Sequence, residues 1–484
     1  MRQTNRPLTV VALLLALFMA AMEMTVVSTA MPTVVGELGG ALHYAWVFTA
    51  YMLTSTVTVP IYGKLSDVYG RKPVMLAGMA LFLFGSMASG QARTMEQLIV
   101  FRAIQGIGAG GMQPVAITIV GDIFKLEERA KMQGVFGAVW AIAGLAGPLL
   151  GGLIVKLLSW RWVFYVNVPF GLLSSILLVG ALHESIEKKK PRLDLAGAAV
   201  LSAAVIALLL GVDGVLPIVL LPAAAILAVA FLFVERRAAE PMLPLSLFAS
   251  RTMSTASAVF AMSGGAMIGL VTFLPLYAQG VLGSSPTEAG ATIAGMAVSW
   301  PIASAISGRL IPRHGFRIFV RVGMSMVAVV SVLIAIALGH SATGGQLRVA
   351  SVAFGIGMGL ANTALIIAVQ TSVGFSQRGV ATASTMFFRN IGGTVGVGVM
   401  GVVLARALLK SETAQAAGGA ELVARILGPD RKNVDGSILR AISGDLAIGL
   451  ADVLWVVAAL GIVAAIAAAF FPAVSTADAT PSKR

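Results

Sequence analysis

Long apolar stretches of about twenty residues alternate with short polar gaps along the whole chain, and lysine and arginine gather in every second gap. A helix of about twenty residues crosses a hydrocarbon layer about 30 Å thick. The pattern therefore predicts an all-α integral membrane protein with about fourteen transmembrane helices. The predicted spans are 8–31, 45–62, 74–91, 97–121, 132–155, 162–182, 195–212, 215–234, 255–281, 288–311, 318–339, 347–373, 379–407 and 447–471.

The basic residues predict the orientation of these helices, because lysine and arginine favour cytoplasmic loops. With the N-terminus inside, the inner gaps carry the basic clusters, and the short outer gaps hold chiefly Arg93 and Arg161. The one long outer gap, 408–446, is mixed in sign, and long loops escape the rule. An even number of spans preserves the pattern, so both termini are expected in the cytoplasm. The inner clusters contain Lys64, Arg71, Lys72, Lys125, Arg129, Lys131, Lys188, Lys189, Lys190, Arg192, Arg236, Arg237, Arg251, Arg309, Arg313, Arg317, Arg321, Arg378, Lys483 and Arg484.

Composition excludes several function classes. Hydrophobic residues make up 58% of the chain, charged residues 11%, and the mean hydropathy is +0.92. A net charge of +13 would suggest nucleic-acid binding in a soluble protein. Here loop orientation explains the charge, so no nucleic-acid partner is expected. The chain has no cysteine and only four scattered histidines, so disulfides and thiolate chemistry are excluded and no metal site is expected.

Two sequence motifs occur twice. The pattern of 63–71, with Gly63, Gly70 and Arg71, recurs at 308–317, and the glycines of 106–110 recur at 355–359. Related halves are typical of transporters built from repeated helix bundles. The predicted domains are an N-terminal six-helix bundle, a two-helix insert with flanking loops, and a C-terminal six-helix bundle that contains the long outer loop. Their predicted ranges are 1–185, 186–250 and 251–484.

The second copy of each motif lacks a charge that the first copy has. Asp67 corresponds to Pro312, and Arg102 corresponds to Ser351. We therefore expect ion coupling in the first half and a second half that mainly shapes the substrate cavity.

Three ionisable residues lie inside predicted spans, where a charge is expensive and therefore a candidate for function: Glu23, Arg102 and Arg389. Glu23 could load and release a proton, or it could be paired permanently with a neighbouring donor. Arg102 stays charged, so it could bias the proton on a nearby carboxylate or hold backbone carbonyls. The alternative for Arg102 is an arginine that extends to the membrane surface. For Arg389, a structural role between helix ends is favoured.

Two glycine-rich stretches lie inside predicted helices. The stretch 106–111 matches the GxGxxG dinucleotide pattern, which has meaning only between a strand and a helix, so close helix packing is the better explanation. In the stretch Gly147-Pro148 with Gly151-Gly152, proline removes a backbone hydrogen bond and the glycines permit a kink. That kink is either a sealing or hinge element or a passive bend.

At this point the residues resemble a known family. The stretch 63–72 is similar to the signature loop of the major facilitator superfamily, and 102–110 resembles its fourth-helix motif. The stretch 147–152 resembles the fifth-helix motif of antiporters. The stretches 23–32 and 160–169 resemble motifs of the fourteen-helix drug:proton antiporters.

This resemblance implies export of apolar or cationic drugs in exchange for protons, by alternating access between two bundles. Asp67 and Arg71, with Gly63, Gly70 and Lys72 in the same loop, would form a cytoplasmic gate. Glu23 and Arg102 would couple protons, although the family usually has aspartate at the first position. In the antiporter motif, Ala143 replaces the first glycine. Further candidates for structural or substrate contacts are Thr25, Gln105, Arg389 and Asn390.

The resemblance also implies a monomer in a bacterial inner membrane, with protons, amphipathic small molecules and lipid as partners and the proton gradient in place of a cofactor. The rival transporter is a proton-coupled exporter of one metabolite, lipid or siderophore. A membrane enzyme is disfavoured because the chain shows neither a metal-ligand cluster nor a nucleophile–base pair. A channel is disfavoured by the repeat and by the scarcity of pore-lining charge.

Overall fold

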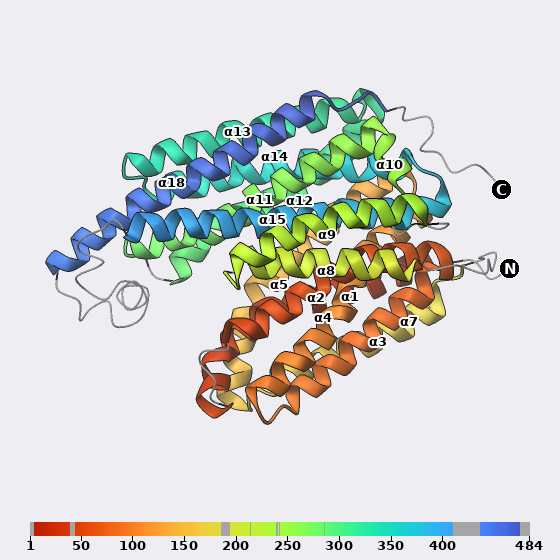
Figure 1. The fold of residues 1–484 in the computed structure, drawn as a ribbon, viewed down its shortest axis with the longest axis horizontal. Helices are drawn as coiled ribbons and strands as arrows, with labels where there is room; N and C mark the ends of the chain where they lie inside the picture. The colour runs from red at the N-terminus through yellow and green to blue at the C-terminus, as the bar shows by residue number, and fades with distance from the viewer. Residues whose placement is uncertain are drawn as a thin grey trace. The chain divides into compact units, whose positions relative to one another are not determined.

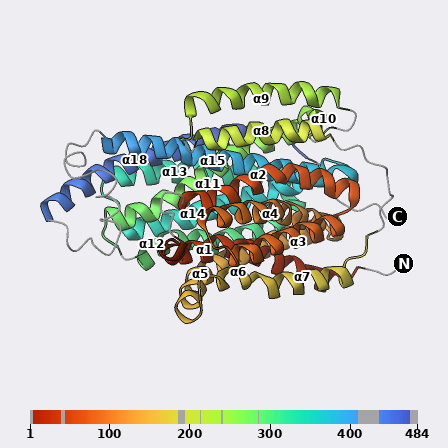
Figure 2. The same cartoon turned by 60° about the horizontal axis from the view of Figure 1, so that its bottom comes forward.

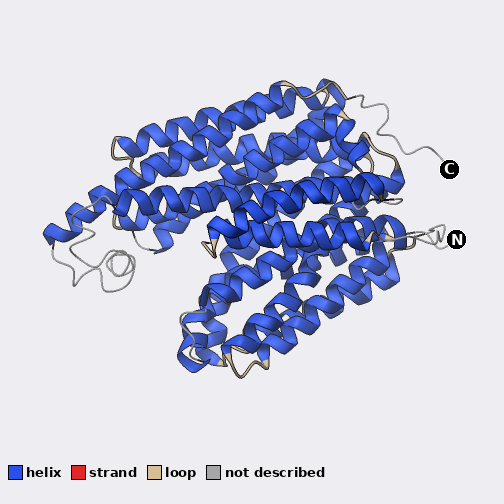
Figure 3. Cartoon of the chain, in the orientation of Figure 1, coloured by secondary structure: helices blue, strands red, loops and turns tan. Residues whose placement is uncertain are grey.

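The computed structural model describes residues 4–38, 44–184, 194–212, 214–238, 241, 243–284, 286–409 and 436–474. The regular structure in these ranges is helical throughout (Figure 3), which confirms the all-α fold class. Eleven of the described helices are long and apolar enough to cross a membrane, and helix α8, Leu195–Val212, is a shorter apolar helix. The predicted basic residues at 188–192 and 483–484 lie outside the described residues.

Each of the predicted spans falls on helix, and the sixth is divided between α6 and α7. The helices are α1 Arg6–Leu38, α2 Tyr44–Tyr69, α3 Arg71–Gly90, α4 Met95–Ile123, α5 Leu126–Leu157, α6 Trp162–Tyr165, α7 Asn167–Ala181, α8 Leu195–Val212, α9 Pro217–Arg237, α10 Leu245–Ala249, α11 Arg251–Gly280, α12 Pro286–His314, α13 Phe316–Gly339, α14 Gly344–Thr371, the 3-10 turn η2 Phe375–Gln377, α15 Arg378–Leu409 and α18 Gly436–Ala469.

The predicted outer loop 408–446 is partly helical, because α15 continues to Leu409 and α18 begins at Gly436. The remaining residues of that prediction, 410–435, are outside the described ranges. Hydropathy places a helix only where the chain is apolar, so it misses helical turns that continue into polar sequence.

The chain forms two compact units. Of the described residues, unit 1 contains those within 4–253 and 366–387, and unit 2 contains those within 254–365 and 388–474. The ends of α14 and α15 that flank η2 therefore belong to unit 1, and the remainder of both helices belongs to unit 2. Within unit 1, α8 and α9 pack side by side as a pair (Figures 1 and 2). The predicted division into six, two and six helices stays a prediction.

Glycines allow α4 to pack tightly against α2 and α3 in unit 1. A Cβ at Gly106 would overlap the Tyr51 carbonyl oxygen of α2, and a Cβ at Gly108 would overlap the Phe82 backbone nitrogen of α3. Thr54 of α2 donates a hydrogen bond from Oγ1 to the Ala103 carbonyl oxygen at 2.8 Å. The GxGxxG stretch therefore serves helix packing within α4, as predicted.

Unit 2 repeats these contacts with other residues. A Cβ at Gly355 of α14 would overlap the Met296 carbonyl oxygen of α12, and Gly357 packs in the same way against Gly323 of α13. Ser299 donates a hydrogen bond to the Val352 carbonyl oxygen at 2.9 Å, which is the counterpart of the Thr54 bond. The predicted internal repeat is thus present in the packing of helices as well as in the sequence.

The loop motif has the same backbone conformation in both units. Gly70 has φ 100° immediately before α3, and Gly315 has φ 74° immediately before α13. Only glycine adopts such a conformation without strain, which explains its presence in both copies.

We predict that Gly108→Ala lowers the free energy of unfolding in detergent by about 1–3 kcal/mol, because the new methyl group meets backbone atoms of α3 that cannot move aside. Thermal unfolding followed by intrinsic fluorescence measures this loss. The matched control is Gly144→Ala in α5, where a Cβ meets nothing within 4 Å and no loss is expected. Equal effects of the two substitutions would contradict the packing argument.

Candidate functional site

Glu23 of α1 lies at the centre of a polar cluster inside unit 1. Its side chain is fully buried, and its Oε1 accepts a charged hydrogen bond from Nη1 of Arg102 in α4, which is 1% exposed. Arg102 Nη1 also donates to Gln105 Oε1 at 2.8 Å. The structure thus brings together three residues predicted as site candidates. The arginine does not extend to the membrane surface, so the alternative for Arg102 is wrong.

Two further contacts of Arg102 come from α2. Its Nε donates to the Val47 carbonyl oxygen at 3.3 Å, and its guanidinium carbon lies 4.3 Å from the centre of the Tyr51 ring. A guanidinium over an aromatic face gains electrostatic stabilisation that is larger away from water. Arg102 is therefore compensated by a carboxylate, an amide, a carbonyl and a ring.

The second oxygen of Glu23 contacts α7. Asn167 Nδ2 donates to Glu23 Oε2 at 2.5 Å and also to Ser86 Oγ of α3 at 3.0 Å. Ser86 in turn donates to the Phe164 carbonyl oxygen of α6 at 2.8 Å. Asn167 and Ser86 are completely buried. One carboxylate thus links α1 to α4 and, through an amide and a hydroxyl, to α3, α6 and α7.

The glycines of the stretch 147–152 pack α5 against α1 close to this cluster. Thr25 Oγ1 donates to the Ala143 carbonyl oxygen at 3.3 Å, and a Cβ at Gly147 would overlap the same hydroxyl. A Cβ at Gly151 would lie 3.0 Å from the Val26 carbonyl oxygen, whereas one at Gly152 would only touch a methyl group at 4.0 Å. Residues 126–157 form one helix, α5, and the kink predicted at Pro148 stays a prediction.

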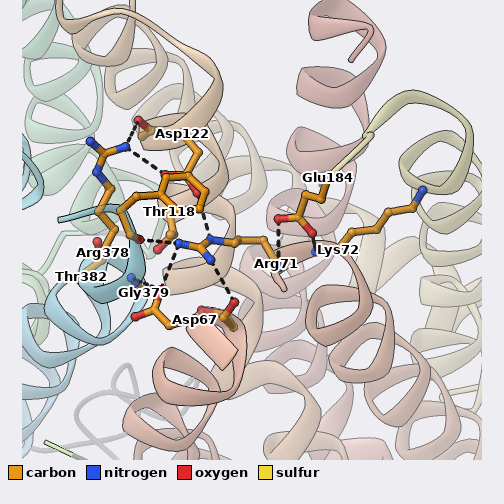
Figure 4. A network of polar contacts seen from close by, with 12 residues as sticks. Asp67, Arg71, Lys72, Thr118, Asp122, Glu184, Arg378, Gly379 and Thr382 are labelled. Carbon is orange, nitrogen blue, oxygen red and sulfur yellow. Dashed lines mark hydrogen bonds and ion pairs between the residues drawn. The ribbon is translucent and has the colours of Figure 1, made fainter. Parts of the chain in front are cut away.

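Asp67 binds the N-terminus of α15. Its two carboxylate oxygens accept the backbone N–H groups of Gly379 and Val380, both at 2.8 Å (Figure 4). An anion at a helix N-terminus satisfies unpaired N–H groups and interacts favourably with the helix dipole. Gly63, one helical turn before Asp67, allows this approach, because a Cβ there would overlap Ala383. Gly63 and Asp67 together hold the first turns of α15 against α2.

Arg71 connects Asp67 to a second carboxylate. Its guanidinium lies 3.0 Å from Asp67 Oδ1 and 2.9 Å from Asp122 Oδ2, and it donates to the Phe375 carbonyl oxygen at 2.8 Å. Asp122 Oδ1 accepts from Arg378 Nη1 at 3.1 Å. Figure 4 shows this chain of alternating charges, two carboxylates and two guanidiniums. All four belong to unit 1.

The same loop fixes the start of α3. Glu184 accepts the backbone N–H groups of Arg71 and Lys72 at 3.0 and 2.9 Å. The Lys72 ammonium donates to the Val179 and Leu182 carbonyl oxygens at 2.7 and 2.8 Å, which are unpaired acceptors at the end of α7. Lys72 therefore joins α3 to α7, and the gate role predicted for it stays a prediction.

A smaller cluster lies at the C-terminal end of α1. Glu37 Oε2 accepts from the buried Trp160 indole N–H at 2.9 Å and from Arg161 Nη1 at 3.1 Å. These hydrogen bonds, first from Trp160 and then from Arg161, lower the pKa of the Glu37 carboxyl below its ordinary value. This end of α1 is thus tied to the residues immediately before α6.

Arg389 and Asn390 lie in the part of α15 that belongs to unit 2. A Cβ at Gly264 of α11 would overlap the Arg389 carbonyl oxygen, and the Asn390 carbonyl oxygen accepts from Thr394 Oγ1 at 3.1 Å. The roles predicted for this pair stay predictions. Among the described residues, no group of three histidine, aspartate or glutamate side chains could hold a metal ion.

Several residues of these clusters had no predicted role, among them Glu37, Ser86, Asp122, Asn167 and Glu184. Asn167 stood in a recognised motif, and Asp122 was visible as a lone acid between an apolar span and a basic gap. Neither signal identifies a partner. Ser86 gave no signal, because a serine in an apolar helix is common.

Comparison with known proteins places the chain in a family. The family model of the Major Facilitator Superfamily matches residues 13–397. The chain belongs to the major facilitator superfamily. It is 39% identical to the multidrug transporter protein MdtP of Bacillus subtilis, over 83% of this chain and 76% of the relative. It is also 38% identical to multidrug resistance protein 3 of the same organism, over 83% and 80% of the two chains.

A solved structure of the same superfamily shares the fold. The proton:xylose symporter XylE superimposes with a TM-score of 0.63 over 95% of this chain and 94% of that one, at 13% sequence identity. At this identity the likeness concerns the fold alone. The chain is thus a multi-pass membrane protein of a transporter superfamily with the all-α fold of that superfamily.

We predict that Asp122→Asn lowers the free energy of unfolding in detergent by about 3 kcal/mol, because it leaves the buried guanidinium of Arg71 and the half-buried one of Arg378 short of one carboxylate charge. Chemical or thermal unfolding of purified protein measures the loss. The control is Glu128→Gln, an acid that is 43% exposed and 4.0 Å from Arg6, for which a change under about 1 kcal/mol is expected. If Asp122→Asn lowered the free energy of unfolding as little as Glu128→Gln, the charge chain would contribute little to stability.

Proposed function

We propose that the protein exports amphipathic or cationic drugs across the cytoplasmic membrane in exchange for protons. The observation that carries the proposal is the buried pair of Glu23 and Arg102, a carboxylate with a fixed positive partner inside an apolar bundle. The names of the two Bacillus relatives, a multidrug transporter and a multidrug resistance protein, support drugs as the cargo.

Glu23 is the proton carrier in this proposal. While it is ionised, Arg102 neutralises it and the pair is tolerated in the apolar interior. A proton on the carboxylate removes the negative charge, so the ion pair ends and the guanidinium needs another compensation, which a change of conformation provides. Each pH unit across the membrane supplies about 1.4 kcal/mol and each 100 mV about 2.3 kcal/mol per charge. These energies suffice to move a balanced equilibrium between two conformations.

We place the end of unit 1 that contains Asp67 and Arg71 in the cytoplasm, with both chain termini, because basic residues crowd the gaps there. The charge chain of Asp67, Arg71, Asp122 and Arg378 would then act as the cytoplasmic gate. This charge chain binds residues 366–387 to the other helices of unit 1. The two helices that contain this segment, α14 and α15, continue into unit 2. Alternating access would therefore break and reform this chain in each cycle.

An exporter of one metabolite, lipid or siderophore on the same fold is the alternative. Competition separates the two, because a multidrug exporter transports chemically unrelated cations such as ethidium and tetraphenylphosphonium by one pathway. Mutual inhibition of these two probes supports drug efflux, and transport of neither supports the alternative.

We predict that Glu23→Gln abolishes proton-coupled efflux, because the amide keeps the shape of the side chain but binds no proton. The measurement is the collapse of a respiration-generated pH gradient in everted vesicles on addition of tetraphenylphosphonium. The control is Glu37→Gln, an exposed acid on the same helix, which should retain transport. Gradient collapse in the Glu23→Gln variant equal to that in the unaltered protein would remove Glu23 from the mechanism.

A further inference from the structure

We propose that Asn167 is a positioning residue for proton exchange, which with Ser86 holds Glu23 in its ionised form until α1 and α7 separate. The inference rests on the proposed role of Glu23 as the proton carrier. It assigns the exchange step to a hydrogen-bond chain that begins at the Phe164 carbonyl oxygen.

The direction of every hydrogen bond in this chain is fixed. A carbonyl oxygen only accepts, so the single hydroxyl hydrogen of Ser86 goes to Phe164. Ser86 Oγ can therefore only accept from Asn167, and the facing atom must be the amide nitrogen. The second hydrogen of that nitrogen points at Glu23 Oε2, at 2.5 Å.

The opposite orientation of the amide is excluded by the same partners. A flipped Asn167 would place its carbonyl oxygen against a carboxylate oxygen and against a hydroxyl oxygen whose hydrogen is already used. The amide oxygen as observed is buried and has no hydrogen-bond partner in the described part of the chain. The two hydrogen bonds donated by the amide nitrogen therefore determine the orientation of the Asn167 side chain.

Both oxygens of Glu23 are consequently occupied by donors. Arg102 donates to Oε1 and Asn167 donates to Oε2. Each oxygen keeps a second lone pair that could take a proton, but each N–H donor stabilises the ionised form and so disfavours protonation. Withdrawal of one donor therefore favours protonation, and Asn167 is the neutral one, whose loss leaves no uncompensated charge. Breaking the hydrogen bond to Asn167 of α7 therefore costs less free energy than breaking the ion pair with Arg102 of α4.

Few titratable groups besides Glu23 itself could change the pH dependence of its protonation. Among the described residues, Arg102 of α4 and Tyr51 of α2 are the titratable groups that interact with Glu23. Helices α3 and α7 contribute the neutral Ser86 and Asn167, and α5 faces this part of α1 with an alanine and glycines. A change in the pH dependence after substitution of Asn167 therefore reports on its hydrogen bond to Glu23.

The test measures proton release from purified protein on addition of tetraphenylphosphonium, from pH 5 to pH 9. In Asn167→Leu, loss of the donor should raise the pH midpoint of release by about one unit, because a hydrogen bond to a charged group is lost. Asn167→Asp should raise the midpoint further by adding a like charge. Ser86→Ala should raise it less, since the amide keeps its donor but becomes free to turn.

Ser174→Ala is the matched control. Ser174 lies on the same helix, is equally buried, and donates from Oγ to the Ala12 carbonyl oxygen of α1 at 2.7 Å, so it joins α7 to α1 without touching Glu23. It should lower thermal stability and leave the midpoint unchanged. If both Asn167 variants fail to fold, the pH midpoint of proton release in Ser86→Ala tests the proposal instead.

Two outcomes separate this inference from the proposed function. Unchanged midpoints in the Asn167 and Ser86 variants, with release abolished by Glu23→Gln, would overturn the role of Asn167 and leave the proton carrier in place. Normal release in Glu23→Gln would overturn both. A raised midpoint in the Asn167 variants, absent from Ser174→Ala, is the result that we expect.

Discussion

A charge inside an apolar helix bundle must be compensated by the protein itself, since water is absent from a hydrocarbon layer. The organisation of unit 1 follows from this constraint. Glu23 is stable at the centre of the bundle because Arg102 and Asn167 bind its two oxygens, and Arg102 is stable because α2 and α4 bind its other donors. Removing Glu23 or Arg102 leaves the other charge without compensation, so these residues function as one unit.

The helix scaffold is repeated in the two units, but the chemistry is not. Thr54 and Ser299 make equivalent hydrogen bonds to the glycine-bearing helices α4 and α14. The position of Arg102 is occupied in unit 2 by Ser351, whose hydroxyl donates to the Arg348 carbonyl oxygen within its own helix. Packing needs glycines and small hydroxyl residues in both units, whereas the proton carrier of the proposed function is needed once. This difference is consistent with the expectation of ion coupling in the first half.

Sequence patterns predicted the scaffold well because its causes are local. Apolar length defined the spans, and paired glycines identified close helix contacts, as at Gly106 and Gly355. The pairing of Glu23 with Arg102 was one of several open interpretations, since a motif names a residue without its neighbours. The contacts of Ser86 and Asp122 could not be predicted, because they depend on which helices meet at a given height. Helix ends in polar sequence, as at Gly436, also lie beyond the reach of hydropathy.

Packing around α1 suggests how a proton could be converted into motion under the proposed function. On one side, Thr25 and Val26 pack directly against the backbone of α5 at Gly147 and Gly151. This contact is rigid, because glycine has no side chain that could change its rotamer. On the other side, α1 is held at this height by hydrogen bonds to Glu23. Protonation weakens the second attachment and leaves the first unchanged. We infer that α1 and α5 then move together relative to α4 and α7, which gives the glycines of α5 a role in coupling as rigid contacts, whether or not Pro148 bends the helix.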